Sequence, residues 1–115
     1  MTQRRNHFDA VSNYFDDIER GIGKRGSSFT DIDGMSHDRD GDRFLFREFK
    51  TNGEQMDIHQ YEALKALARL PKCTVWFLRK LGDGKIRFGA IGSNEPGEII
   101  SEEEYKQRLR KWWTS

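Results

Sequence analysis

The amino-acid sequence predicts an α/β domain in which helices flank a mixed β-sheet. Apolar residues recur at helical spacing in three segments, residues 6–20, 57–70 and 101–113. Between these segments lie two pairs of short runs rich in aromatic and β-branched residues, with turn residues between the members of each pair. The expected order is therefore helix, two strands, helix, two strands, helix. A chain of 115 residues has the length of one domain, so we expect a single domain over residues 1–115.

The first helix is expected over residues 6–20, where Phe8, Val11, Phe15 and Ile18 form one apolar stripe. The glycines of the next segment, GIGKRG, end this helix. That segment matches the G-x-G-x-x-G pattern of dinucleotide-binding proteins, but the pattern requires a strand before it and a helix after it. Because a helix precedes it here, we interpret the segment as a basic loop.

A β-hairpin is expected next, with strands over about 29–37 and 43–50 and a two-residue turn at Asp40-Gly41. Three aspartates near the turn suggest a calcium loop, but the spacing excludes one. If Asp38 is the first position of such a loop, Arg43 occupies the glycine position and Phe49 the position of the bidentate glutamate. A solvated turn explains these aspartates better.

The middle helix is expected over 57–70, with Asp57 as its N-cap and Pro71 as its stop. Gln60 lies on the apolar face of this helix, which predicts a buried polar side chain that needs a partner. The segments 73–80 and 85–91 then read as two strands around the turn LGDG.

The last helix is expected over 101–113, where Ser101 and Glu104 have the spacing of a capping box. Its apolar stripe consists of Tyr105, Leu109 and Trp112. A stripe of this kind needs a partner surface, so the helix should pack on the domain core.

The composition excludes several classes of protein. No apolar run approaches the ~18 residues of a membrane span, and the first ten residues lack the apolar core of a signal peptide. The single cysteine, Cys73, cannot form an internal disulfide, which suits a reducing cytoplasm, and three scattered histidines do not make a common zinc site. The net charge is +1, so contact with nucleic acid would depend on local patches of charge. We expect a cytoplasmic protein without a membrane segment.

Charged residues fall on the inner face of the predicted hairpin. Glu48 and Lys50 share one face of the second strand with two phenylalanines, because side chains alternate along a strand. With a two-residue turn at Asp40-Gly41, the numbers of paired residues sum to 81. This register places Asp33 across from Glu48 and Asp31 across from Lys50.

Two carboxylates directly across a strand pair repel each other, so Asp33 and Glu48 call for a cation between them. A hard divalent ion such as Mg²⁺ suits carboxylate oxygens, and Lys50 lies close enough to orient a water. The register favours Asp33 as the first metal ligand and Asp31 as the second. The alternative is that Lys50 neutralises Glu48 or Asp31 in an ordinary surface network of ion pairs.

From Phe29 to Leu70 the chain resembles the PD-(D/E)XK nuclease superfamily, with the greatest similarity to its small phage and Holliday-junction-resolvase-like or VRR-NUC-like branches. The residues that carry the resemblance are Asp31-Ile32-Asp33-Gly34, Glu48-Phe49-Lys50 and Gln60. Thr30 stands where the family has its proline, and the glycine- and serine-rich segment 21–28 leaves little room for the family's first core strand.

The resemblance implies a restriction-endonuclease-like mixed β-sheet flanked by helices, and a Mg²⁺- or Mn²⁺-dependent DNA endonuclease of a phage or bacterial cell. It implies that Asp33, Glu48 and the backbone carbonyl of Phe49 bind the metal ion. It also implies that Lys50 lies beside the attacking water and that Gln60 supports the site. Asp33, Glu48, Lys50 and Gln60 are thus the expected catalytic residues.

Lys24, Arg25 and Asn52 are the residues expected to contact DNA, because they flank the predicted site. No element that reads base sequence is apparent, so we expect recognition of DNA structure. A domain of this size offers little surface to a duplex, so it is expected to act as a homodimer or with a partner protein. The alternative function is an inactive adaptor that keeps the nuclease fold and docks through Trp112 and Trp113.

Overall fold

The structure is a computed structural model that describes residues 14–15, 17–18, 21–22, 32–94 and 96–115. The chain divides into two compact units, Met1–Asp31 and Ile32–Ser115. In the first unit the described residues are helical. They agree with the expected helix, except that Gly21 and Ile22 are helical where the helix was expected to end.

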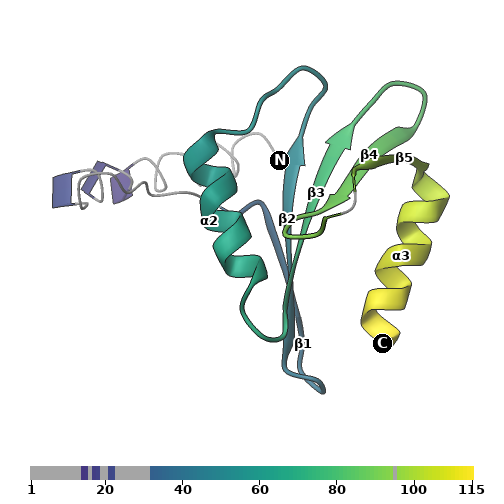
Figure 1. Ribbon diagram of the computed structural model, residues 1–115, viewed down its shortest axis with the longest axis horizontal. Coiled ribbons are helices and arrows are strands. Elements are labelled where there is room, and N and C mark those ends of the chain that lie inside the picture. Colours follow the sequence, from purple (N-terminus) through teal and green to yellow (C-terminus); the bar gives the residue numbers. More distant parts are fainter. Residues whose placement is uncertain (1–13, 16, 19–20, 23–31, 95) are drawn as a thin grey trace. The chain divides into compact units, whose positions relative to one another are not determined.

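The second unit contains one five-stranded sheet in which the spatial order of the strands follows their order in the chain (Figure 1). The strands are β1 (Gly34–Asp38), β2 (Arg43–Lys50), β3 (Cys73–Lys80), β4 (Lys85–Ala90) and β5 (Glu98–Ser101). β2 and β3 are parallel, whereas every other neighbouring pair is antiparallel. The sheet is therefore mixed, as the sequence predicted.

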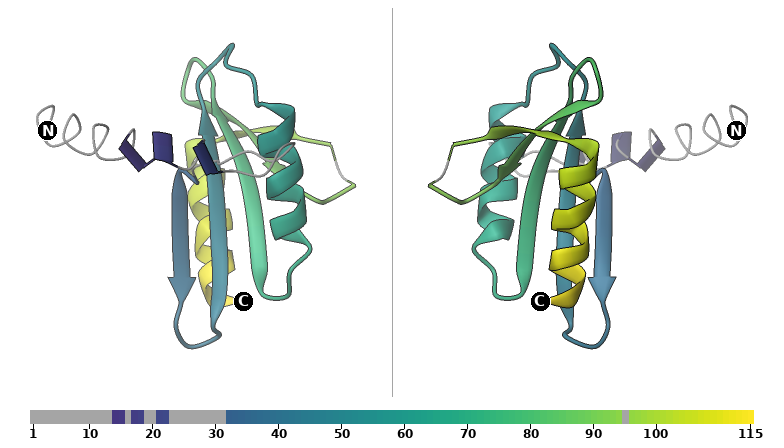
Figure 2. Two further views of the ribbon diagram at one scale, coloured as in Figure 1. Left: turned by 90° about the vertical axis from the view of Figure 1, so that its left-hand side faces the viewer. Right: turned by 90° about the vertical axis from the view of Figure 1, so that its right-hand side faces the viewer.

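Two helices cover opposite faces of this sheet, α2 (Ile58–Ala68) and α3 (Glu102–Thr114) (Figure 2). α2 connects the parallel strands β2 and β3, because a parallel pair needs a crossover rather than a tight turn. Both predicted N-caps are present. Asp57 accepts a hydrogen bond from the amide of His59, and the Ser101 hydroxyl accepts one from the amide of Glu104. Neither described helix combines the length and apolar composition of a membrane span.

The main apolar core lies between the sheet and α3. Its buried members come from four strands and the helix: Leu45, Trp76, Leu78, Phe88, Ile100 and Trp112. Tyr105 and Leu109 pack against this cluster, so the predicted stripe of the last helix does face the core. Arg43 borders the core at the C-terminal end of α3, where it stacks on the Trp112 ring and donates to the Trp112 carbonyl oxygen at 2.9 Å.

The hairpin has the predicted register but not the predicted turn. The pairs run from Gly34–Arg47 to Asp38–Arg43, so the numbers do sum to 81. The connection is a four-residue turn over 39–42 instead of the two-residue turn at Asp40-Gly41. The Asp38 carboxylate accepts from the Asp40 amide and from the Arg43 guanidinium, which draws the chain out of the ladder one pair earlier.

Two strands differ from the sequence prediction. The sequence suggested a strand from about residue 29, but β1 begins at Gly34, with Ile32 and Asp33 outside the strand and Asp33 in a bend. Residues 29–31 lie outside the described residues. β5 was not predicted, because its four residues include one glutamate and one serine and give too short an apolar pattern. β5 is stabilised by antiparallel pairing with β4, which local sequence does not reveal.

Candidate functional site

The predicted polar residues meet where β2 ends, on the face of the sheet from which Gln60 of α2 contacts Glu48. Figure 1 shows α2 beside this strand. Glu48 and Lys50 lie two residues apart on β2, and their side chains contact each other. The antiparallel β1 begins at the same end of the sheet, because its first paired residue, Gly34, lies opposite Arg47. The start of β1 and the end of β2 therefore bring Asp33 close to Glu48.

Glu48 is the only buried charged residue among those that the structure describes, with a relative exposure of 2%. Its Oε1 accepts a hydrogen bond of 2.8 Å from Nε2 of Gln60 and lies 3.3 Å from Nζ of Lys50. Its Oε2 is also buried but has no hydrogen-bond partner among the described residues. Oε1 is thus bound by two neighbours, whereas Oε2 lacks the hydrogen-bond donor or cation that a buried carboxylate oxygen needs.

Asp33 lies one position beyond the last pair of the β1–β2 ladder. Continuation of the register would set it across from Glu48. Its Oδ2 accepts a hydrogen bond of 2.9 Å from the backbone amide of Phe49, which anchors the aspartate at the end of β2. Asp33 and Glu48 are therefore neighbours in space, although 15 positions separate them in the chain.

The surroundings of Glu48 disfavour its charge. Burial raises the pKa of the Glu48 carboxyl above its usual range, and the nearby negative charge of Asp33 raises it further. The Lys50 ammonium opposes both effects by lowering the same pKa. A buried carboxyl next to a second carboxylate is the arrangement expected of a site that gains stability when a cation binds.

Lys50 has two carboxylate partners and little exposure. Its side chain is 11% exposed, and its Nζ lies 3.3 Å from Glu48 and 3.7 Å from Oε2 of Glu54. Glu54 also accepts hydrogen bonds from the amide and the hydroxyl of Thr51. The ion pair with Glu48 is the contact that the alternative interpretation anticipated, and it equally holds the ammonium beside the unpartnered Oε2.

The polar turn after β2 is fastened by a residue that the sequence analysis missed. Arg79 on β3 donates hydrogen bonds to the backbone carbonyl oxygens of Thr51 and Glu54. Arg79 pairs with Lys50 in the parallel ladder, so its side chain points to the same face. Alternation along 73–80 places Arg79 on the face of Phe77, but its partners depend on the parallel pairing of β2 with β3.

The other expected residues stand apart from this cluster or outside the described chain. Asn52 is exposed in the turn after β2 and makes no hydrogen bond or ion pair within the described residues. Lys24, Arg25 and Asp31 lie outside the described residues. The structure thus brings together Asp33, Glu48, Lys50 and Gln60.

A divalent ion would find two carboxylates here. Within residues 32–94 and 96–115, no group of three or more histidine, cysteine, aspartate or glutamate side chains converges. The donor atoms at the end of β2 are nevertheless hard oxygens, which suit Mg²⁺ or Mn²⁺. A buried carboxylate oxygen without a partner is unfavourable, and a bound cation would remove that cost for Oε2 of Glu48.

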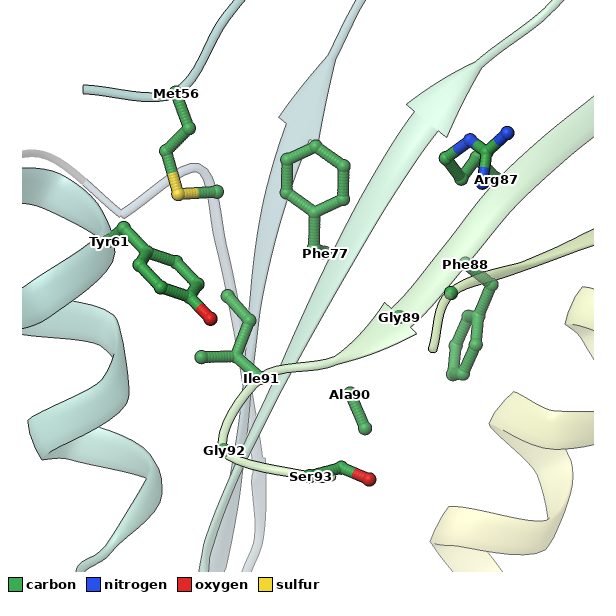
Figure 3. Close-up of a pocket in the computed structure, with 11 residues that line it drawn as sticks. Met56, Tyr61, Phe77, Arg87, Phe88, Gly89, Ala90, Ile91, Gly92 and Ser93 are labelled. Carbon is green, nitrogen blue, oxygen red and sulfur yellow. The ribbon is translucent and has the colours of Figure 1, made fainter. Parts of the chain in front are cut away.

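An apolar cavity of about 330 Å³ lies on the same face of the sheet as the site. Figure 3 shows Met56 and Tyr61 on one side of it and Phe77 on another, with Ile91 between α2 and the strands. Phe77 pairs with Glu48 in the β2–β3 ladder, and Tyr61 follows Gln60 on α2. None of Asp33, Glu48, Lys50 and Gln60 lines this cavity.

Comparison of the chain with models of protein families, with curated proteins and with solved structures finds no match. These comparisons show no family for this chain.

Proposed function

We propose that this protein is a metal-dependent endonuclease that hydrolyses phosphodiester bonds of DNA, with a restriction-endonuclease-like fold. The observation that carries the proposal is the buried, unpartnered Oε2 of Glu48, a carboxylate that has Asp33 and Lys50 as neighbours. The β1–β2–α2–β3 arrangement supports it, because it presents the aspartate, the E-x-K pair and the helix glutamine in the order of the PD-(D/E)XK superfamily.

Asp33 and Glu48 would hold the Mg²⁺ or Mn²⁺ ion, with the Phe49 carbonyl and Asp31 as further ligands. Such an ion, when bound, acidifies a coordinated water and stabilises negative charge on the phosphate. Gln60 fixes Oε1 of Glu48 and so directs Oε2 toward the ion-binding position. Lys50 contributes a fixed positive charge that positions the water and stabilises the pentavalent phosphate.

The proposed substrate is DNA recognised by its structure, in a phage-infected or bacterial cytoplasm. The unit is small, so we expect it to cut as a homodimer or together with a partner protein. Lys24, Arg25 and Asn52 are the proposed contacts to the DNA backbone.

The alternative function is an adaptor that retains the fold without cleavage. One observation favours it, because the 3.3 Å ion pair between Lys50 and Glu48 already neutralises one carboxylate without a metal. An adaptor that uses this pair for structure alone would not respond to divalent ions.

Thermal unfolding in EDTA and in millimolar Mg²⁺ or Mn²⁺ separates the two functions. A ligand that binds only the native state raises its stability, so the nuclease predicts a higher melting temperature with metal. Glu48→Gln should remove that increase, and in EDTA it should unfold at or above the wild-type temperature because repulsion from Asp33 is relieved.

Cleavage of a panel of linear, nicked, branched and single-stranded DNA substrates completes the test. Metal-dependent cuts that Glu48→Gln abolishes would support the nuclease. If the wild-type protein shows no metal-induced shift in melting temperature and no cleavage, the nuclease proposal is refuted and the adaptor is favoured.

A further inference from the structure

A second cavity, of about 400 Å³, lies between the α3 face of the sheet and the first half of α3. Its apolar lining comes from Phe49 on β2, Leu78 on β3, Ile86 on β4 and Tyr105 on α3. Two of these four side chains are aromatic rings. The volume falls within the range of ~300–1,000 Å³ that is typical of pockets for small organic groups.

The same cavity has a surplus of positive charge. Four lysines and one glutamate line it: Lys50, Lys80, Lys85, Lys106 and Glu102. Lys50 pairs with Glu48 and Glu54, and Lys106 makes a long contact of 3.9 Å with the exposed Glu103. Lys80 and Lys85 are exposed and have no ion pair within the part of the chain that the structure describes. Apolar side chains bordered by unpaired lysines suit a ligand that has a flat, apolar ring system linked to a negatively charged group.

Two residues at the end of β2, Phe49 and Lys50, belong both to this cavity and to the candidate metal site. The backbone amide of Phe49 donates to Asp33, whereas the ring of Phe49 points to the other face of the sheet and lines the cavity. The Phe49 side chain is 46% exposed, which is unusual for a large apolar residue in the second strand of five. The cavity and the candidate metal site therefore share the end of β2, on opposite faces of the sheet.

We propose that this cavity binds one unpaired nucleobase of the substrate DNA, with the flanking phosphates on Lys80 and Lys85. The inference rests on the proposed nuclease function and narrows its substrate to DNA that has unpaired bases beside the cut. Base stacking on an aromatic side chain accepts any base, because every base has a π face. A base inside an intact duplex would have to leave its stack to enter this cavity.

Binding of a fluorescent oligothymidylate to the full chain, followed by anisotropy in EDTA, tests the proposal without cleavage. Phe49→Leu keeps an apolar side chain but removes the ring, and it should weaken binding by about five-fold or more. Lys80→Glu and Lys85→Glu should each weaken binding by roughly ten-fold, because a favourable contact becomes a repulsive one. The matched control is Lys72→Glu, an exposed lysine at the opposite end of β3, which should bind within about two-fold of wild type.

Photo-crosslinking tests the position of the bound base directly in the wild-type protein. An oligonucleotide with one 5-iododeoxyuridine should crosslink to Phe49 or Tyr105, as mapped by mass spectrometry. Crosslinks confined to other parts of the chain would overturn the proposal.

Three further results would overturn it. These are an equal loss of binding in Lys72→Glu and Lys85→Glu, unchanged binding by Phe49→Leu, and tighter binding to a duplex or to an acidic peptide than to the single strand. The binding assay needs neither metal nor cleavage, which keeps this test independent of the nuclease proposal. Metal-dependent cleavage without the expected binding pattern would refute the base-binding cavity alone, and the binding pattern without cleavage would refute the nuclease alone.

Discussion

Gln60 on α2 donates a 2.8 Å hydrogen bond from its Nε2 to Oε1 of the buried Glu48 on β2. This bond joins the helix to the strand that precedes it, across a turn of polar residues. It also makes the two oxygens of Glu48 unequal, because Oε1 is held and Oε2 is not. In the proposed site, Gln60 therefore leaves Oε2 as the oxygen that would bind the cation.

Gln60→Ala should reduce cleavage about 10- to 100-fold, the usual effect of removing a group that orients a metal ligand. Glu48→Ala should cause a larger loss, because it removes the ligand itself. Rates measured under single-turnover conditions compare the two variants. His59→Ala is the matched control, since His59 is the adjacent, exposed residue on α2, and its rate should stay close to wild type. Equal losses in Gln60→Ala and Glu48→Ala would contradict the orienting role.

Lys50→Met should reduce single-turnover cleavage by about 100-fold or more while the metal-induced rise in melting temperature persists. In the proposed mechanism Lys50 supplies charge to the chemical step and does not bind the metal. Lys72→Met serves as the control for loss of a lysine elsewhere on the surface. Cleavage by Lys50→Met within a few-fold of wild type would show that the ammonium has a structural role only.

Asp38→Asn should lower the melting temperature near neutral pH but have a diminishing effect in acid. The hydrogen bonds from Arg43, which include one of 2.6 Å, lower the pKa of the Asp38 carboxyl in the folded protein. Because the pKa of Asp38 is lower in the folded than in the unfolded protein, the ionised carboxylate stabilises the fold at pH values above its unfolded pKa of 3.8. This stabilisation is lost as the pH falls through the folded pKa.

Melting curves of wild type and Asp38→Asn from neutral pH down to below that value should therefore converge in acid. Asp40→Asn is the matched control, since the Asp40 side chain makes no hydrogen bond or ion pair within the described residues. A constant difference between Asp38→Asn and wild type at every pH would contradict the ionic origin of the effect.

Trp112→Ala should lower the free energy of unfolding by about 3–5 kcal/mol, because the ring fills the core and supports Arg43. Trp113→Ala should change it by about 0.5 kcal/mol or less, because Trp113 is 44% exposed. Urea unfolding measures both values. A comparable loss in the two variants would mean that Trp113 also belongs to the core, which would leave no exposed tryptophan for docking at this end of α3.

Much of the fold could be predicted from local patterns. The helix at 57–70 and the helix at 101–113 have N-caps and apolar stripes that can be read in the sequence, and both caps form. The hairpin register also follows, because alternation and the turn position restrict it to one parity. The place of Gln60 on the inner face of its helix follows from the helical period alone, and it predicts a polar partner without naming it.

Other features required the tertiary structure. β5 exists because β4 offers it an edge to pair with, and four residues carry too little pattern to predict it. The start of β1 at Gly34 depends on the bend in which the Phe49 amide holds Asp33. The role of Arg79 in holding the turn after β2 depends on the parallel pairing of β3 with β2.

The sequence by itself determined which residues of the hairpin and of the middle helix share a face, since that depends only on the periods of strand and helix. Only the tertiary structure decided that Glu48 is buried, that Gln60 and Lys50 both approach its Oε1, and that its Oε2 has no partner among the described residues. Burial and the pKa depend on what other segments place around a group. Those segments meet because apolar surface is removed from water when α2 packs on the sheet, and that free energy belongs to the whole unit rather than to any short stretch of the chain.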